Sequence, residues 1–395
     1  MATALQGIKV LEMTRFIAGP YAGSVLASLG ADVVKIEPPD GDVVRSFGPT
    51  KAGVGIPFEM MNHNKKGLVI DLKKPGGQEV VHRMVRDADV VLESSRPGTA
   101  ERLGVSYERL SQINPRIIYC SISGFGQDGP YRTLGGVDIV AQAMGGLMGM
   151  TGEQDGEPVK VSLPIADYGC GMWAVIGILA ALNARRHTGR GQLVDSALLD
   201  TPIAWSLWEA SRYFGLGEIP EPLGSSHRNV APYRAFRCAD DRHVVIGAAS
   251  QALWEKLCQA LGVPDLLKDE RFGSPPLRVR HRAVLEAALE PLFHDKTSDE
   301  WLSLLNAASV PCGLVKRYDE ALNDPQVKRR GMIAQVQHSK AGELSILDVP
   351  VYLSDTPRVP VSQAPGLGEH SVSVLEGWGF GDDEIRALLS GDIVA

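Results

Sequence analysis

One aspartate, Asp167, stands where a glycine-containing segment meets a long apolar run. The segment reads Leu163-Pro164-Ile165-Ala166-Asp167-Tyr168-Gly169-Cys170-Gly171, and the apolar run after it extends to Leu182. This pattern predicts a buried helix that begins near Asp167. The first turn of a helix has unpaired N–H groups and favours an anion. Asp167 could therefore be only a helix cap, because aspartate is a favoured N-cap residue.

The two glycines that follow Asp167 favour a chemical role instead. Gly169 and Gly171 are poor helix formers, yet they fall in the predicted first turns. Glycine suits a position where a ligand must approach the main chain closely. A carboxylate at such a position could attack an activated carbonyl, while main-chain N–H groups stabilise the oxyanion that forms. We therefore predict that Asp167 is a nucleophile.

The overall composition limits the classes of protein to consider. The chain has 395 residues, which suggests two domains, and its 44% apolar content is enough for a core. A net charge of −7 argues against a nucleic-acid partner, because phosphate binding needs a basic surface. Local basic pockets for a phosphorylated small molecule remain open.

Cysteine usage and the N-terminal segment favour a cytoplasmic protein. The five cysteines show no CxxC pair, so neither a disulfide framework nor a zinc site is predicted, and we expect no metal. The first residues lack the pattern of a signal peptide. The most apolar run, around Trp173–Leu182, is near 11 residues, which is too short to span a bilayer. We expect no membrane partner.

The first third of the chain alternates predicted strands and helices. The predicted strands are residues 8–13, 32–37, 67–72, 89–92 and 116–122, and the predicted helices between them are 21–29, 77–86 and 106–113. This alternation predicts an α/β fold with a doubly wound, mostly parallel sheet. In such sheets ligands bind beyond the carboxyl ends of the strands.

The loops at those strand ends exclude two common cofactor sites. Thr14–Pro20 after the first strand is not GxGxxG, and no GxxxxGK[ST] loop occurs, so nicotinamide chemistry and ATP-driven ligation lose support. Arg96 and Arg102 follow the fourth strand, and Lys73 follows the third. These cations could bind phosphate oxygens, or they could be ordinary surface charges.

The pattern of elements changes after about residue 225. Residues 232–238 and 243–247 predict a hairpin, and the segments 251–261, 278–293 and 298–308 predict helices. Short strands at 344–346 and 349–353 and a helix near 371–378 complete the prediction. We therefore expect a large Rossmann-like domain over 1–220, to which 335–395 returns, and a small α+β domain over 225–330.

Several short motifs, in order along nearly the whole chain, resemble one family. They are Gly7-Ile8-Lys9-Val10-Leu11, Ala18-Gly19-Pro20, Leu29-Gly30-Ala31-Asp32-Val33-Val34-Lys35-Ile36-Glu37, Asn64-Lys65-Lys66, Arg96-Pro97-Gly98, Ser123-Gly124-Phe125-Gly126-Gln127, Thr188-Gly189-Arg190-Gly191-Gln192 and Leu367-Gly368-Glu369-His370. Together they resemble the class III CoA-transferases, the family of formyl-CoA:oxalate and carnitine CoA-transferases. Asp167 falls where that family has its nucleophilic aspartate.

The resemblance implies a ping-pong transfer of CoA between carboxylic acids. The aspartate forms a mixed anhydride with the acyl group and then a thioester with CoA. An aspartate with a reference pKa near 4 is ionised at neutral pH and needs no separate base. Neither ATP nor a tightly bound cofactor is implied, and CoA or acyl-CoA is the substrate. Family members are typically interlocked homodimers.

The resemblance also implies where CoA binds. The residues that match the family's CoA-binding segments are Ile17, Ala18, Leu72, Lys73, Ser95, Arg96, Arg102 and Val137. One departure concerns the segment Glu93-Ser94-Ser95-Arg96-Pro97-Gly98, which many members replace by Glu-Asn-Phe-Arg-Pro-Gly. The aromatic residue that could stack on a base is therefore missing here.

The acceptor is the least determined part of the prediction. The segments 224–227 and 231–236 look most like the branch that handles succinyl-CoA and dicarboxylates such as glutarate. A second carboxylate needs a cation, for which Arg45, His227 and Arg228 are candidates, although each could be a surface residue.

Two other functions stay open. One is an α-methylacyl-CoA racemase, whose base is a His in a Gly-His-Asp segment. This chain has Gly136-Val137-Asp138 instead, and valine cannot transfer a proton. The other is a CoA-binding protein without turnover.

Overall fold

The computed structural model describes residues 2–395, which form two compact units. The first unit contains the chain up to Leu147 together with Lys160–Ser211 and Gln326–Ala395, and the second contains Met148–Val159 and Arg212–Pro325. Compared with the predicted domains, the smaller unit also takes in Met148–Val159. Met1, the first residue of the predicted large domain, lies outside the described residues.

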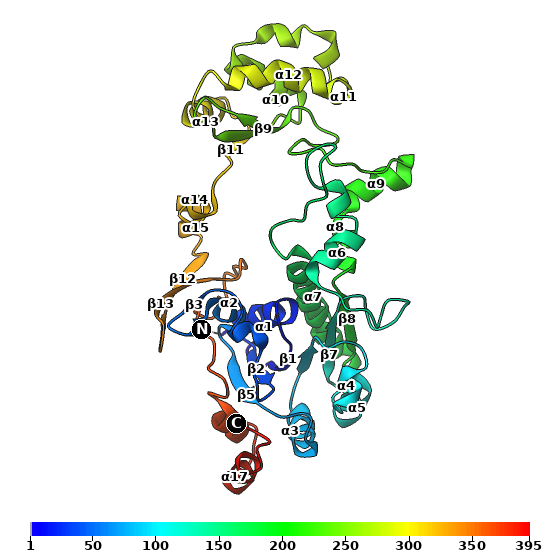
Figure 1. Cartoon of the computed structure of the whole chain (residues 1–395), viewed down its shortest axis with the longest axis vertical. Coiled ribbons are helices and arrows are strands. Elements are labelled where there is room, and N and C mark those ends of the chain that lie inside the picture. The colour runs from blue at the N-terminus through cyan, green and yellow to red at the C-terminus, as the bar shows by residue number, and fades with distance from the viewer. Residues whose placement is uncertain (1) are drawn as a thin grey trace. The chain divides into compact units, whose positions relative to one another are not determined.

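A parallel sheet of six strands lies at the centre of the first unit (Figure 1). Its order is β5-β2-β1-β6-β7-β8. The strands are β1 (Lys9–Met13), β2 (Asp32–Glu37), β5 (Lys66–Val69), β6 (Val90–Glu93), β7 (Ile118–Ser123) and β8 (Leu193–Ala197). Successive strands are added on one side of β1 and then on the other, so the topology switches between β1 and β6. The predicted mostly parallel sheet is confirmed.

Helices cover both faces of this sheet, because alternate strand residues point to opposite sides. Val10 packs with helices on one face, whereas its neighbour Leu11 packs with helices on the other. The helices of the first face are α1 (Ala18–Ser28) and α7 (Ile165–Thr188). The helices of the second face are α3 (Pro75–Val85), α5 (Tyr107–Ile113), α16 (Ser371–Gly377) and α17 (Asp382–Ser390).

The chain near its C-terminus completes one edge of the sheet. Val394 forms an antiparallel bridge with Ile70, directly after β5. The N–H of Asp71 donates to the carbonyl of Ile393 at 2.9 Å. The loop that follows β5 is therefore held by residues from the other end of the sequence.

The connections of the first unit contain short elements. They are β3 (Thr50–Lys51), β4 (Val54–Gly55), α2 (Ile56–Asn62), α4 (Thr99–Arg102), α6 (Asp138–Met144), α8 (Asp200–Trp205), β12 (Ile333–His338), β13 (Gly342–Leu347) and the 3-10 turn η1 (Val43–Arg45). Two helices cross the boundary between the units: α9 (Leu207–Leu216) and α15 (Pro325–Arg329). β13 pairs with β12, which precedes it. Residues 349–353 form no strand, so the strand predicted there is wrong.

The second unit has its own sheet and core. The sheet has the order β11-β10-β9, with β9 (Tyr233–Arg237), β10 (His243–Gly247) and β11 (Cys312–Leu314). Its helices are α10 (Gln251–Leu261), α11 (Pro275–Arg280), α12 (Arg282–Phe293), α13 (Ser298–Ala307) and α14 (Tyr318–Leu322), with 3-10 turns η2 (Met148–Met150), η3 (Pro264–Leu267) and η4 (Glu270–Phe272). The rings of Phe236 and Phe293 stack 4.5 Å apart in the core. The helix predicted over 278–293 is two helices that meet at His281.

The helix α7 is longer than the apolar run that marks it in the sequence. It has 24 residues, so by length and composition alone it could cross a membrane, contrary to the prediction from the run of about 11. A core helix of a soluble protein has the same properties, and 44% of its most apolar window is buried in the protein.

Candidate active site

Asp167 lies in the first turn of α7, which begins at Ile165. The residue at the N-cap position is Pro164, and no side chain of α7 caps the helix, so the predicted cap role of Asp167 is wrong. The N–H groups of Ile165 and Tyr168 donate to the carbonyls of Leu163 and Pro164, at 2.8 and 3.0 Å.

A side chain from another helix accepts the remaining N–H groups of this turn. The N–H groups of Ala166 and Asp167 donate to Oδ1 of Asp138, at 2.8 and 3.4 Å. All four N–H groups of the first turn thus have acceptors inside the protein. The prediction that unpaired N–H groups at the N-terminus of α7 could bind an anion is therefore wrong.

The glycines after Asp167 serve helix packing. A β-carbon at Gly169 would come 2.5 Å from Cη2 of Trp205 in α8, and one at Gly171 would come 2.5 Å from the carbonyl oxygen of Ala18 in α1. Both residues also follow the first four of the helix, whose N–H groups alone lack intrahelical acceptors. The prediction that a ligand approaches the backbone at Gly169 and Gly171 is therefore wrong. These glycines allow α8 and α1 to pack closely against α7.

The carboxyl group of Asp167 is half-buried and makes no hydrogen bond or ion pair with residues 2–395. Burial, and after it the negative charge of Asp138, together raise its pKa to about 7. The predicted ordinary pKa near 4 is therefore wrong. Asp167 is therefore protonated to a much larger extent at neutral pH than an exposed aspartate.

A cavity of about 520 Å³ opens at the carboxyl ends of β1, β2 and β6. Leu72, Lys73, Ser95 and Arg96 line it, as expected for residues near a ligand at this edge. Arg15 also lines it. The sequence signal for Arg15 was its position directly after the first strand, which the prediction did not use.

Three cations face this cavity without partners. The side chains of Arg15, Lys73 and Arg96 form no ion pair with any residue in the described range 2–395. Arg102 lies on α4 beside the cavity, and its Nη2 donates to Oγ1 of Thr99, a lining residue, at 2.9 Å. An arrangement of this kind can bind a ligand with several phosphate charges.

A buried carboxylate fixes the loop that carries Arg96. Glu93 is 4% exposed, accepts a hydrogen bond from the N–H of Ser95 at 2.7 Å and another from the hydroxyl of Ser121. Burial raises the pKa of Glu93, whereas these hydrogen bonds lower it. The backbone at Ser95 is thus held although the family's aromatic residue is missing.

Two segments of the first unit run from the cavity to the region of Asp167. The first is the loop after β1, which begins with Thr14 in the cavity wall and reaches Ala18 against the first turns of α7. Ile17 precedes α1 in this loop. Neither Ile17 nor Ala18 lines the cavity itself.

The second segment leads from Arg96 to Asp138. A β-carbon at Gly135 would come 3.2 Å from Nη2 of Arg96, so the guanidinium lies against this backbone. Val137 follows, 58% exposed, and Asp138 binds the first turn of α7. The chain therefore runs from the cavity to the first turns of α7 along both segments, and Asp167 itself does not line the cavity.

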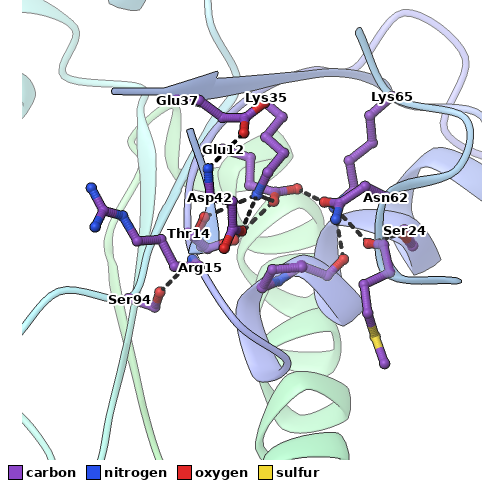
Figure 2. Close-up of polar contacts among 12 residues, drawn as sticks. Glu12, Thr14, Arg15, Ser24, Lys35, Glu37, Asp42, Asn62, Lys65 and Ser94 are labelled. Carbon is purple, nitrogen blue, oxygen red and sulfur yellow. Dashed lines mark hydrogen bonds and ion pairs between the residues drawn. The ribbon is translucent and has the colours of Figure 1, made fainter. Parts of the chain in front are cut away.

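Buried ion pairs hold the first of these segments in place (Figure 2). Nζ of Lys35 donates to the carbonyl of Thr14 at 3.0 Å and pairs with Asp42 at 3.1 Å and Glu12 at 3.4 Å. Nζ of Lys65 pairs with Glu12 at 2.8 Å. All of these charged side chains are buried, so the loop has little freedom to move.

The ammonium of Lys65 also binds the start of α1. It donates to the carbonyl of Pro20 at 2.8 Å and to Oδ1 of Asn62, a residue of α2, at 2.9 Å. Burial lowers the pKa of Lys65 to about 8, while the charge of Glu12 opposes this shift.

Of the predicted acceptor-binding cations, Arg45 lies in the first unit, and His227 and Arg228 lie in the second. Arg45 donates to both carboxylate oxygens of Glu37, at 2.8 and 2.6 Å, and its guanidinium stacks 3.8 Å from the centre of the Phe58 ring. It lines a different cavity, of about 560 Å³. His227 and Arg228 belong to the second unit, where the His227 ring lies 5.2 Å from that of Tyr233.

Metal ligands do not gather anywhere in the described part of the chain. Among residues 2–395 no three His, Cys, Asp or Glu side chains are placed to hold a metal ion. The expectation that the chemistry needs no metal stays a prediction.

Known proteins resemble this chain over nearly its whole length. A family model described as CoA-transferase family III matches residues 5–371. A protein of Fusarium pseudograminearum named acyl-CoA transferase is 37% identical, with 99% of this chain and 88% of that protein covered. A succinate–glutarate CoA-transferase of Agrobacterium fabrum is 35% identical, with 94% of each covered.

A solved structure shares the whole fold. It is a CAIB/BAIF family protein from Brucella suis, with a TM-score of 0.85 and 37% identity, and the match covers 96% of this chain and 100% of that one.

Proposed function

The chain belongs to CoA-transferase family III, and from this premise we propose that it moves CoA from succinyl-CoA to a dicarboxylic acid through Asp167. The observation that carries the proposal is the pair of segments that lead from a cation-lined cavity to an unpaired carboxyl group. The choice of succinyl-CoA and a glutarate-like acceptor is supported by the name of the Agrobacterium fabrum relative.

The first half of the proposed reaction transfers CoA to the enzyme. The ionised carboxylate of Asp167 attacks the thioester carbonyl, the C–S bond breaks, and CoA thiolate leaves behind a mixed anhydride. The thiolate then attacks the Asp167 carbonyl of the anhydride and releases the donor acid as a carboxylate. An aspartyl-CoA thioester remains.

The second half returns CoA to the acceptor. The acceptor carboxylate attacks the Asp167 carbonyl and displaces CoA thiolate, which gives a second mixed anhydride. The thiolate attacks the acceptor's carbonyl, and Asp167 leaves as a carboxylate. Every step keeps an activated acyl bond, so the sequence of steps needs neither ATP nor a tightly bound cofactor.

Oxyanion donors for these steps must come from outside the first turn of α7, because its N–H groups are occupied.

We place the phosphates of CoA in the 520 Å³ cavity. Lys73, Arg96 and Arg102 supply the charges, with Leu72 and Ser95 beside them. The pantetheine arm then follows the segment that contains Val137 toward Asp167, with Ile17 and Ala18 near the adenosine.

Arg96→Gln should raise the KM for acyl-CoA by about ten- to a hundredfold and change kcat little. The reason is the loss of one charge-assisted hydrogen bond, which contributes about 1.5–3 kcal/mol. Steady-state kinetics at two salt concentrations would measure it. Arg109→Gln removes the same charge from the exposed face of α5 and is the matched control. Equal KM values for the two variants would contradict this placement of the phosphates.

For the acceptor, the second carboxylate needs a cation, and Arg45, His227 and Arg228 remain the candidates. Arg45 could serve only by giving up one oxygen of Glu37. Arg228 likewise donates to the carbonyl of Glu221, and Nδ1 of His227 accepts from the N–H of Asn229, so none of the three is preferred on this ground. Their replacement by Gln should raise the KM for a dicarboxylate more than the KM for a monocarboxylate.

We also propose that two copies of the chain form an interlocked homodimer. Large apolar side chains of α9 are exposed, among them Leu207 at 78% and Phe214 at 83%, and a second copy would cover them. Sedimentation should give twice the chain mass of 42.5 kDa. A cytoplasmic location fits the five cysteines, all of which are free.

A direct assay tests the reaction. The protein is incubated with succinyl-CoA and a panel of mono- and dicarboxylic acids without ATP, and we expect a new acyl-CoA with at least one acid. Exchange of deuterium at C2 of an acyl-CoA without any acceptor would instead identify a racemase. Hydroxylamine should trap Asp167 in an enzyme, whereas a protein that only binds CoA would bind without being modified.

A further inference from the structure

The start of α7 is stabilised by a residue of a different helix. Asp138 is the first residue of α6, and its Oδ1 accepts from the N–H groups of Ala166 and Asp167. Asp138 stands 28 residues before Ala166 in the sequence. It accepts hydrogen bonds from the first turn of the helix, as a side chain at the N-cap position usually does. A carboxylate is also the best partner for the positive end of a helix.

Asp138 is itself held in a fixed orientation. Its Oδ2 accepts from Nε2 of Gln142 at 2.6 Å, one turn further along α6. Gln142 is fully buried, and its Oε1 accepts from the N–H of Val161 at 2.9 Å, so it also ties down the chain that leads into α7. Both oxygens of Asp138 are therefore occupied. Its position is determined by α6, by α7 and by the segment before α7 that contains Val161.

The side chain of Asp167 is left free by this arrangement. It does not have to turn back to its own helix end, because Asp138 already serves the N–H groups there. Within the described range it makes no hydrogen bond or ion pair. It can therefore rotate toward a thioester without breaking a contact.

The groups around Asp167 are mostly neutral. From α1, the phenol ring of Tyr21 packs at 5.1 Å against that of Tyr168, and burial raises the pKa of Tyr21. On α7 itself, burial raises the pKa of the Cys170 thiol to about 12, so it stays protonated. Asp138 is the charged group that acts on Asp167.

We infer that Asp138 is a positioning residue for the reaction: its carboxylate fixes the first turn of α7, keeps Asp167 free and places a negative charge beside it. This inference deepens the proposed function and rests on it. The negative charge of Asp138 favours the protonated form of Asp167 in the free protein. In the second half-reaction the same charge disfavours the step in which Asp167 leaves as an anion. The balance between the two is visible in the pH dependence.

Asp138→Asn is the variant that separates charge from shape. The asparagine oxygen can still accept from Ala166, but the negative charge and the acceptor for Nε2 of Gln142 are lost. The acid limb of the kcat/KM profile, which we expect near pH 7 in the unaltered protein, should then move down by about one pH unit. It should not return to the ordinary value, because burial of Asp167 remains.

Two further variants complete the kinetic test. Asp138→Glu keeps the charge but moves the oxygens, so the limb should stay within about 0.3 pH units while kcat falls by about tenfold or more. Asp299→Asn removes the same charge from the exposed first turn of α13 and should change neither. An unmoved limb in Asp138→Asn, or an unchanged kcat in Asp138→Glu, would overturn the inference.

A second measurement does not need turnover. Carbodiimide modifies protonated carboxyl groups, and peptide mass spectrometry can follow the labelling of Asp167 alone across pH 4–9. The labelling midpoint should fall by about one pH unit in Asp138→Asn and stay in place in Asp138→Glu. If the protein proved not to transfer CoA, this midpoint would still decide the role of Asp138, so the two failures are distinguishable.

Discussion

Asp167→Asn should end CoA exchange and at the same time raise the melting temperature of the chain at pH 8. The amide is not a nucleophile, so we expect a loss of at least about 10⁴-fold, as for other covalent catalysts that lose the attacking group. The gain in stability has a separate cause. The pKa of Asp167 is about 7 in the folded chain against 3.8 as a reference, so the folded state resists ionisation.

The sign of this stability effect follows from linkage. A carboxyl group with a raised folded pKa contributes stability that is fully present below pH 3.8 and is lost as the pH rises through about 7. Asparagine cannot ionise and does not suffer this loss. The difference in melting temperature between variant and unaltered protein should therefore grow from pH 5 to pH 8.

Calorimetry at pH 5 and pH 8 and a discontinuous assay of acyl-CoA formation measure the two effects on one preparation. Asp167→Ala is the companion variant for the assay, because it also removes the carboxyl group. Exchange that persists in both variants would exclude Asp167 as the nucleophile. A melting temperature that falls equally at both pH values would show that the carboxyl group has ordinary solvation.

Lys65→Met should cost about 3–5 kcal/mol of unfolding free energy. The buried carboxylate of Glu12 would keep Lys35 at 3.4 Å but lose the closer ammonium at 2.8 Å, and an uncompensated buried charge is expensive. The carbonyl of Pro20 would lose its donor as well. Denaturant titration at pH 7 measures the change.

The neighbouring lysine is a matched control. Lys66 pairs with Asp32 at the same distance of 2.8 Å, but these side chains are 50% and 39% exposed. Lys66→Met should therefore cost less than about 1 kcal/mol. Equal losses for the two variants would mean that Lys65 contributes no more than a surface charge.

The sequence allowed the sheet and its helices to be predicted where local patterns agree with the fold. Asp32–Glu37 and Gln251–Leu261 have the predicted bounds, because an apolar run or an apolar stripe coincides with a stop or cap signal, such as Ser250 before α10. His281 separates α11 from α12 without a proline or glycine at the break, so the pattern of apolar residues continues across it. β12 was not predicted. It lies in a two-stranded ribbon in which only Val336 and His338 are buried, so its sequence has too few buried apolar residues to mark a strand.

The candidate site was predictable in part, for the same reason. Asp167 and the cations after the strands stand at positions that the topology of a parallel sheet makes accessible to ligands. The contact between Asp138 and the start of α7 joins residues that no local rule connects. The shifted pKa of Asp167 and the packing of Gly169 against Trp205 depend on the same tertiary neighbours, so the sequence could not reveal them.

The bridge between Val394 and Ile70 has a consequence for biosynthesis. The wall of the cavity after β5 includes Leu72 and Lys73, and the backbone of Asp71 just before them is held by Ile393. On the ribosome, these contacts of Ile70 and Asp71 form only after residues 393 and 394 have emerged from the exit tunnel. Until that point of synthesis, this wall of the proposed acyl-CoA site lacks the contacts that hold it.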